Sequence, residues 1–218
     1  MAPRPRLTRI AIVDAAEQVL DDVGLDEFGM RAVADRLGTG VASLYRHVAG
    51  KAELLDLVLD RALERLPLRT EGPWRPVLED LARALRVSLL GARDRARIAL
   101  ASSTPTSATA VIAETALGTL VRSGLPARDA VLAVDRLSLY VLSDAASVAA
   151  IRERGTPAEL DAQWQEMSAG YAAIDPAAFP VLTELGPLLA EPDEAERFEF
   201  GLALILDAVA ARIAVGRS

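Results

Sequence analysis

Apolar residues recur along this chain at the three- and four-residue intervals of an amphipathic helix, and no convincing strand pattern interrupts them. The first such stripe follows Thr8, whose hydroxyl suits the start of a helix, and it stops at Gly24. The same spacing predicts the next helices over residues 30–37, from residue 41 onward, and from residue 51 to about residue 66. We therefore expect the first third of the chain to consist of short helices.

The pattern stays helical to the end of the chain, and prolines mark the joints between its segments. It predicts further helices over residues 74–92, 96–102, 107–123, 126–154, 157–171, 179–190 and 193–215. Residues 68–73 hold the turn formers of a connector, which indicates a domain boundary. The expected fold is all-α, and it divides into residues 1–50, a linking helix over residues 51–66, and a larger helical domain over residues 67–218.

The segment from residue 28 to residue 51 combines two short helices with a glycine turn between them. Gly38 can end the first helix with a positive φ at little steric cost. The second helix carries polar side chains around the apolar anchors Leu44 and Val48, namely Ser43, Tyr45, Arg46 and His47. Because hydroxyls, a cation and an imidazole suit phosphates and base edges, the segment is typical of a DNA-binding helix-turn-helix.

The formal net charge of −7 argues against a nucleic-acid partner until its distribution is considered. Residues 1–51 are neutral, with six Arg and one Lys against seven acids, so the whole deficit lies in residues 52–218. Most of the N-terminal acids fall in the first helix and the turn after it, whereas Arg46, His47 and Lys51 come later. This separation favours DNA contact by the later part, although ordinary solvated helix ends would give a similar pattern.

The absence of cysteine excludes disulfides, thiolate catalysis and cysteine-ligated zinc. The N-terminal segment is basic but lacks the apolar run of a signal peptide. The richest apolar segments are broken by Arg, Asp and Glu, whereas a membrane span needs about 20 largely uncharged residues. We expect a cytoplasmic protein that uses no cofactor and no membrane.

Two predicted helices, over residues 127–151 and 198–215, are apolar around most of their circumference. Helices of this kind must be covered on nearly every side, and a single small domain rarely covers two of them. We therefore expect a homodimer in which these helices pair with their copies across a two-fold axis. The alternative is that both are interior helices of a monomer.

Short runs across the helix-turn-helix carry a family resemblance. They are Gly24-Leu25, Met30-Arg31, Val33-Ala34, Leu37-Gly38, Leu44-Tyr45, His47-Val48 and Lys51, followed by Leu54-Leu55. With these residues the chain resembles, over about residues 8–60, the DNA-binding domain of the tetracycline-repressor (TetR) family of transcriptional regulators. Phe179-Pro180 and residues 198–202 and 205–207 are similar to the end of the ligand-binding domain in the tetracycline-repressor subgroup.

The resemblance implies an all-helical homodimer whose N-terminal domains occupy successive major grooves of a partly palindromic operator. It also implies that the C-terminal domain binds a small molecule that weakens DNA binding. Gly29 stands where the family usually has a Ser or Thr helix cap, a change that costs only a few tenths of a kcal/mol, roughly. Thr39 replaces a usual Val, and neither departure alters the assignment.

Family positions that meet base edges correspond to Arg31, Val41, Ala42 and Ser43, and those that hold phosphates correspond to Tyr45, His47 and Lys51. A guanidinium can donate two parallel hydrogen bonds to guanine, which is worth about 1–3 kcal/mol of discrimination. The chain has no Asn, and this region has no Gln, so the bidentate amide contact with adenine is missing. We therefore predict operator half-sites that depend on a G·C pair. The arm around Arg4 and Arg6 could reach the DNA backbone or minor groove.

Several of these residues have an alternative role that the sequence leaves open. Val41 is three residues from Leu44 and could belong to the core. Tyr45 could pack against the first helix, and His47 could be packed or simply solvated. Arg46 lies between two candidate contacts and is better read as a solvated cation.

The resemblance places the effector cavity among the helices between residues 66 and 164, where the side chains are mostly aliphatic. Its candidate lining residues are Trp74, Leu81, Leu85, Leu100, Ser103, Thr104, Tyr140, Asp144 and Trp164. Tyr140 and Asp144 share a helix face with Ser147, and a helix–helix hydrogen bond would use the same residues. The lone histidine lies in the other domain, so binding of a metal–tetracycline complex is not supported. We expect a largely hydrophobic effector of aromatic or polyketide-like kind.

Two other function classes remain open. A helical enzyme acting on an apolar substrate lacks a cysteine nucleophile, a second histidine and an Asp-rich metal motif here, so we expect no enzyme. An activator, or a regulator that responds to no effector, would carry the same DNA-binding domain as a repressor.

Overall fold

The structure is a computed structural model that describes residues 7–102 and 104–216. Within these residues it is all-helical without a strand, which confirms the predicted fold class. The first helices are α1 (Arg9–Glu27), α2 (Met30–Arg36), α3 (Val41–Leu44) and α4 (Lys51–Leu63). The later ones are α5 (Trp74–Leu90), α6 (Arg95–Ala101), α7 (Ser107–Arg122), α8 (Ala127–Arg152), α9 (Pro157–Ala172), α10 (Pro180–Leu185), the 3₁₀ helix η1 (Gly186–Ala190) and α11 (Glu194–Gly216).

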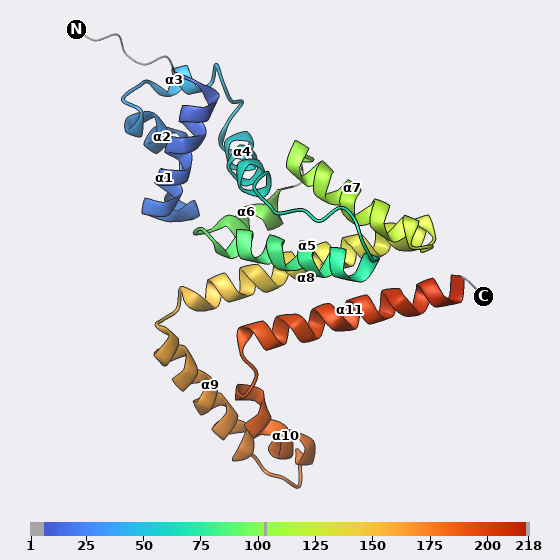
Figure 1. Cartoon of the computed structure of the whole chain (residues 1–218). Coiled ribbons are helices and arrows are strands. Elements are labelled where there is room, and N and C mark those ends of the chain that lie inside the picture. Colours follow the sequence, from blue (N-terminus) through green and yellow to red (C-terminus); the bar gives the residue numbers. More distant parts are fainter. Residues whose placement is uncertain (1–6, 103, 217–218) are drawn as a thin grey trace.

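The helices fall into three groups along the molecule (Figure 1). Helices α1–α3 gather at one end, and α4 leads from them to a body built from α5–α8 and α11. Helices α9 and α10 pack mainly on each other and on η1, and they project from the body. No helix in residues 7–102 and 104–216 has the length and hydropathy needed to cross a membrane.

Local chemistry explains the start of α1 and the two sharp turns that follow it. The Thr8 hydroxyl accepts a hydrogen bond from the Ala11 amide at 3.2 Å, as a helix cap should. Gly24 has φ 77°, which breaks the helix where the sequence predicts its end, and one more helical turn then extends α1 to Glu27. Gly38, at φ 61°, supplies the left-handed residue expected between α2 and α3.

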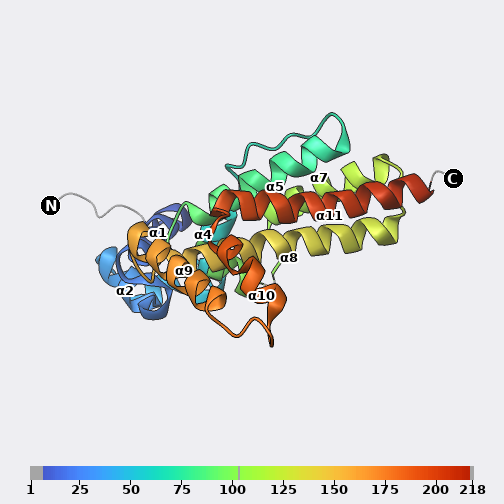
Figure 2. The same ribbon diagram turned by 90° about the horizontal axis from the view of Figure 1, so that it is seen from below.

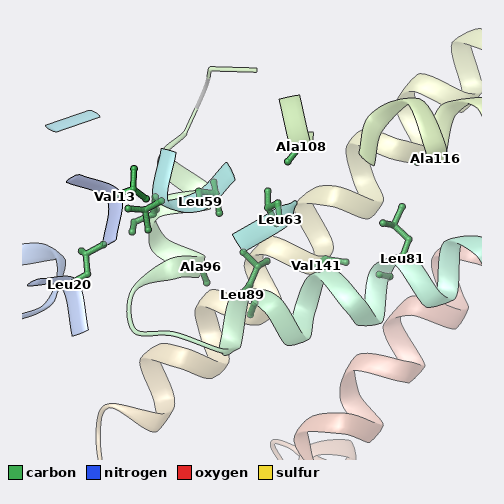
Figure 3. Close-up of a cluster of buried hydrophobic side chains, with 14 of the residues drawn as sticks. Val13, Leu20, Leu59, Leu63, Leu81, Leu89, Ala96, Ala108, Ala116 and Val141 are labelled. Carbon is green, nitrogen blue, oxygen red and sulfur yellow. The ribbon is translucent and has the colours of Figure 1, made fainter. Parts of the chain in front are cut away.

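One apolar core continues from α1 through α4 into the body (Figure 3). The labelled side chains include Val13 and Leu20 of α1, Leu59 and Leu63 of α4, Leu81 and Leu89 of α5, and Val141 of α8. Helix α4 is shorter than predicted, because the Leu66 amide turns back to the Leu63 carbonyl at 3.1 Å. Helix α4 therefore packs against both α1 and the body helices.

Helices α8 and α11, which hold the two segments predicted to be apolar around most of their circumference, lie side by side along the body (Figure 2). Each buries one face, yet each also leaves large apolar side chains 44–76% exposed. The exposed residues are Val131, Leu132 and Leu139 on α8 and Phe200, Leu204 and Val215 on α11. Within a single copy, therefore, neither helix is an interior helix covered on every side.

Candidate DNA interface and ligand cavity

The residues predicted to meet base edges lie at the starts of α2 and α3. Arg31, the second residue of α2, and Ala42 in α3 are exposed, while Val41 and Ser43 are partly buried. Val41 packs partly against the core, which is the alternative that its spacing from Leu44 raised. Leu44 itself is fully buried, so it fixes the position of the short helix α3 and of the side chains around it.

The aromatic and imidazole groups proposed to hold phosphates follow α3 directly. Tyr45 is 53% exposed, so its ring is not packed away against α1. His47 is partly buried, and Arg46 beside it is exposed. The buried Val48 anchors this turn to the core, while Tyr45 and Arg46 are exposed to solvent.

Lys51, the only lysine of the chain, has a more definite position than expected. Its ammonium donates to the Phe28 carbonyl at 2.8 Å and to the Leu25 carbonyl at 3.2 Å, and it lies 5.5 Å from the centre of the Phe28 ring. These carbonyls end α1, where free acceptors and the helix dipole both favour a cation. Lys51 thus ties the start of α4 to the end of α1, a role that the sequence did not indicate.

The acidic residues of α1 are largely engaged by arginines of neighbouring helices. Arg61 of α4 pairs with both Asp14 and Glu17, and Arg36 of α2 pairs with Asp22. These pairs hold α1 against α2 and α4, so ion pairs as well as packing set the orientation of α2 relative to α1. They also neutralise carboxylates that would otherwise repel phosphates.

A network of one hydrogen bond and one ion pair at the start of α4 was not predicted from the sequence. The Glu53 carboxylate accepts from the Ala49 amide and pairs with Arg9 of α1. Glu53 is the third residue of a helix capped by Gly50, the place where a carboxylate commonly satisfies free amides. The third position of a helix could therefore have indicated this role of Glu53 from the sequence. Its contacts hold the starts of α1 and α4 together.

The body contains an apolar cavity of about 430 Å³. Its walls come from α5, α6, α7 and α8, with Leu63 of α4 at one side. The size lies in the usual range for small-molecule sites, and the predominance of aliphatic lining is typical of them. Three predicted residues line it, namely Leu81, Leu85 and Thr104.

The other predicted lining residues lie elsewhere. Leu100 is 44% exposed and does not line this cavity. Trp74 borders a separate, more polar cavity of about 740 Å³ between the connector before α5 and α7. Trp164 lies on the projecting α9, where the Arg197 guanidinium is 5.0 Å from its ring centre. Ser103 lies outside the described residues, as do Arg4 and Arg6.

Tyr140 and Asp144 belong to the junction of α5, α8 and α11. The Tyr140 hydroxyl donates to the Phe198 carbonyl at 2.8 Å, and the two rings stack with centres 5.6 Å apart. Burial raises the pKa of Tyr140. Arg86 donates to Asp144 at 2.6 Å and lies over the Phe198 ring at 4.7 Å. These residues therefore join helices, which is the alternative that their shared face on α8 left open.

Several cavity residues were not predicted, and most of them are small. Alanines on α5, α6 and α7 leave the space, and hydroxyls of Ser102, Thr109 and Ser138 join Thr104 as the polar lining. The sequence feature that could have indicated the cavity is the high frequency of alanine in helices that usually carry larger side chains in a packed domain. Periodicity alone does not show that these small residues face one another.

The rim of the cavity is hydrogen-bonded to α4 by two aspartates one helical turn apart. Ser102, at the end of α6, donates its hydroxyl to Asp56 at 2.8 Å. Asp60 accepts from the Ala108 amide at 2.9 Å and from the Ser107 hydroxyl at 3.3 Å, in the first turn of α7 after its cap Thr106. Both helix ends beside the cavity are therefore bonded directly to α4.

A second link runs from the α5–α6 turn to α1. Asp94 is 4% exposed and, with φ 59°, is the one non-glycine residue at positive φ in residues 7–102 and 104–216. It accepts from the Leu25 amide at 2.7 Å and from Arg97 at 2.7 Å, and Arg97 also donates to Asp26 at 2.8 Å. The Arg97 hydrogen bond lowers the pKa of Asp26. This buried carboxylate at positive φ thus joins the two regions, and its hydrogen bonds offset the cost of burying it.

Comparison with known families accounts for both regions. The chain matches the family model described as bacterial regulatory proteins, tetR family, over residues 12–58. It matches the Tetracyclin repressor-like, C-terminal domain over residues 66–213, which is more than half of its length. The chain belongs to the TetR family.

Relatives within the TetR family align over nearly the whole chain. The tetracycline repressor protein class A from transposon 1721 of Escherichia coli is 33% identical over 216 residues, which cover 95% of this chain and 92% of that protein. The solved structure of the TetR family protein ActR from Streptomyces coelicolor in complex with actinorhodin is 32% identical, with a TM-score of 0.86 and 97% of each chain covered. The repressor DrrR1 of Streptomyces coeruleorubidus is 50% identical over 84 residues, but these cover 37% of this chain and 31% of that repressor.

TetR family proteins are DNA-binding transcriptional regulators and not enzymes. This chain is therefore a DNA-binding transcriptional regulator, and the alternative of a helical enzyme is wrong. Its helix-turn-helix is the part matched by the N-terminal family model, and its apolar cavity lies in the part matched by the C-terminal one.

Proposed function

We propose that this TetR family protein is a ligand-responsive repressor. It binds a partly palindromic operator as a homodimer and is released by a small, largely apolar effector. We assign DNA binding to residues 1–50, the link to residues 51–66, and effector binding and dimerisation to residues 67–218. It acts in the cytoplasm, on the DNA of the cell.

The connection between the cavity and α4 is the observation that carries this proposal. The Ser102–Asp56 hydrogen bond and the hydrogen bond from the Ala108 amide to Asp60 join the cavity rim to the helix that follows the helix-turn-helix. A ligand that displaces either helix end must move α4, strain it, or break these hydrogen bonds. Each outcome alters how the two reading helices of a dimer are spaced, and that spacing must match the half-sites of an operator.

The exposed residues around α3 support the assignment of DNA contacts. We assign Arg31, which is exposed, to guanine in a G·C pair. We assign the methyl groups of Val41 and Ala42 to thymine, with Ser43 as donor or acceptor. The phosphate contacts are assigned to Tyr45, His47 and Lys51. Lys51 has one donor left for a phosphate after its two carbonyl contacts.

A mobility-shift assay on promoter DNA flanking the gene tests these roles. Arg31→Ala should relax the preference for one G·C pair by about 5- to 150-fold, since that pair is worth roughly 1–3 kcal/mol. Tyr45→Ala and Lys51→Ala should weaken every sequence alike and make the salt dependence less steep. Arg154→Ala, an exposed arginine outside the helix-turn-helix, is the control. Unchanged affinity and preference after Arg31→Ala would contradict the assignment of α2.

Unfolding of the Lys51→Ala variant must be measured beside its DNA binding, because that change also removes two contacts with the end of α1. A loss of affinity without a loss of stability supports the phosphate role. A loss of both in proportion supports a role in holding α1 and α4 together.

The uncovered faces of α8 and α11 support the homodimer. The two helices lie side by side on the body, and burying their exposed apolar residues against a second copy removes from water the surface that one copy leaves exposed. Light scattering after size-exclusion chromatography should give about twice the chain mass of 23.2 kDa. A single species at the chain mass would refute the dimer.

The effector is assigned from the aliphatic cavity and from the relative ActR, whose structure was solved in complex with actinorhodin. Adding a neutral compound with fused aromatic rings to the complex of protein and operator should release the DNA. Retention of DNA with every apolar compound supports a regulator that responds to no effector. A reporter gene whose transcription rises with the protein supports an activator instead.

A further inference from the structure

The cavity lining holds no group that could neutralise a charge on a ligand. Its 19 lining residues, all within the described part of the chain, are aliphatic residues and proline apart from two serines and two threonines. The cavity therefore offers hydrocarbon surface and hydroxyls, with no carboxylate, amine, guanidinium, imidazole or amide among the lining residues that the structure describes.

The carboxylates nearest to the rim are already engaged. Asp56 accepts from Ser102, and Asp60 is occupied by the start of α7. Neither residue lines the cavity. A charged ligand would thus lose its hydration without gaining an ion pair, and such a loss is large in an apolar site.

Two of the four hydroxyls are engaged and two are free within residues 7–102 and 104–216. Ser102 donates to Asp56, while the Thr109 hydroxyl accepts from the Thr106 amide at 2.8 Å and donates to the Thr106 carbonyl at 3.0 Å. Thr104 and Ser138 make no side-chain hydrogen bond with these residues. Thr104 is exposed, and the hydroxyl oxygen of the partly buried Ser138 is not sealed from solvent. They come from different walls of the cavity: Thr104 lies in the connector before α7, and Ser138 lies in α8.

We propose that the effector is an uncharged molecule with a hydrocarbon or fused-ring skeleton, and that Thr104 and Ser138 recognise its hydrogen-bonding groups. This inference rests on the proposed ligand-responsive function and deepens it. A volume of 430 Å³ corresponds to roughly 14 water molecules, which is room for a ligand of about two or three fused rings. Each free hydroxyl can donate one hydrogen bond and accept others, so carbonyl and hydroxyl groups on the ligand are matched equally.

The test compares ligands that differ only in charge. The hydroxymethyl, carboxylate and aminomethyl derivatives of anthraquinone, naphthalene and dodecane are each titrated into the full-length protein at neutral pH by calorimetry. The neutral derivative of at least one skeleton should bind at least about a hundredfold more tightly than both charged derivatives, because only the ions must be desolvated without a partner. The same neutral compound should release operator DNA in a mobility shift.

Variants of the two free hydroxyls test the recognition. Thr104→Val and Ser138→Ala should each weaken the neutral ligand by about 2- to 12-fold, the range for losing one hydrogen bond. Ser88→Ala on α5, a serine outside the lining, is the matched control and should leave affinity unchanged. Operator binding without ligand should be the same in all three variants.

Two different failures are distinguishable. A carboxylate or amine bound within tenfold of its alcohol, or unchanged affinity in both hydroxyl variants, overturns the inference about the ligand but leaves a ligand-responsive repressor. If no derivative of any skeleton binds while operator binding is intact, the proposed response to an apolar effector falls, and this inference falls with it.

Discussion

A single added methyl group at Gly201 tests the contact between α8 and α11. A Cβ at this position would lie 2.6 Å from Cζ and 2.8 Å from Cε2 of Tyr140, and closer still to its hydroxyl oxygen. Ordinary contacts of a Cβ are at 3.4 Å or more, so Gly201→Ala must drive the Tyr140 ring out of its place. The ring then loses its hydrogen bond to the Phe198 carbonyl and its stacking on Phe198.

The magnitude follows from these losses and one gain. The hydrogen bond is worth about 1 kcal/mol and the stacking about 1 kcal/mol. Alanine in place of glycine inside a helix returns about 0.5–1 kcal/mol. We therefore expect Gly201→Ala to lower the free energy of unfolding by about 1–1.5 kcal/mol. In a Tyr140→Ala background nothing obstructs the methyl group, so the same change should raise stability by about 0.5–1 kcal/mol.

Denaturant unfolding of the four proteins of this double-mutant cycle, at one fixed chain concentration, measures both effects. Gly170→Ala is the matched control, because a Cβ at that glycine of α9 meets nothing within 4 Å, and it should stabilise the protein in either background. If Gly201→Ala stabilises the wild type as Gly170→Ala does, the close packing of Tyr140 on α11 is wrong.

Three further outcomes are expected from unfolding measurements. Asp60→Ala removes the acceptor of the Ala108 amide and should cost about 0.5–1.5 kcal/mol, whereas Asp60→Asn keeps an acceptor and should cost less; equal costs would contradict the importance of this hydrogen bond. Gly24→Ala should cost about 1–2 kcal/mol, because φ is 77° and the new methyl group would also meet the Arg93 guanidinium at 3.0 Å; a neutral effect would show that the turn can adopt another conformation. The hydrogen bond from Arg83 lowers the pKa of Glu199 in the folded protein, so the stabilisation by this pair is present above pH 4.5 and is lost as the pH falls through that lowered pKa. Glu199→Gln should remove this part of the loss of stability in acid, and an unchanged dependence of stability on pH would refute the prediction.

The helices could be predicted from the sequence because their signals are local. Thr8 caps α1 with its own hydroxyl, and Gly38 reaches a positive φ that other residues rarely adopt. Each depends on a few neighbouring residues, so tertiary packing hardly changes it. The end of α4 was placed too late because its apolar spacing continues past Leu63, while the chain turns there toward the body.

The candidate cavity was predicted only in part, because lining depends on neighbours that are distant in sequence. Periodicity places Tyr140 and Asp144 on one face of α8, but it does not say what lies opposite. In the fold, Arg86 from α5 and Phe198 from α11 occupy that space, so the pair joins helices. Leu81 and Leu85 were predicted to line the cavity and do so.

The sequence by itself determined the helical fold, the helix-turn-helix and the family, since all three rest on residue spacing within short segments. Only the tertiary structure decided that Lys51 closes the end of α1, that Asp56 and Asp60 of α4 bond to the cavity rim, and that the described lining residues of the cavity carry no charge. The reason is physical. A side chain's partner in a folded chain is chosen by the packing of whole helices, and that packing is a property of all of them together.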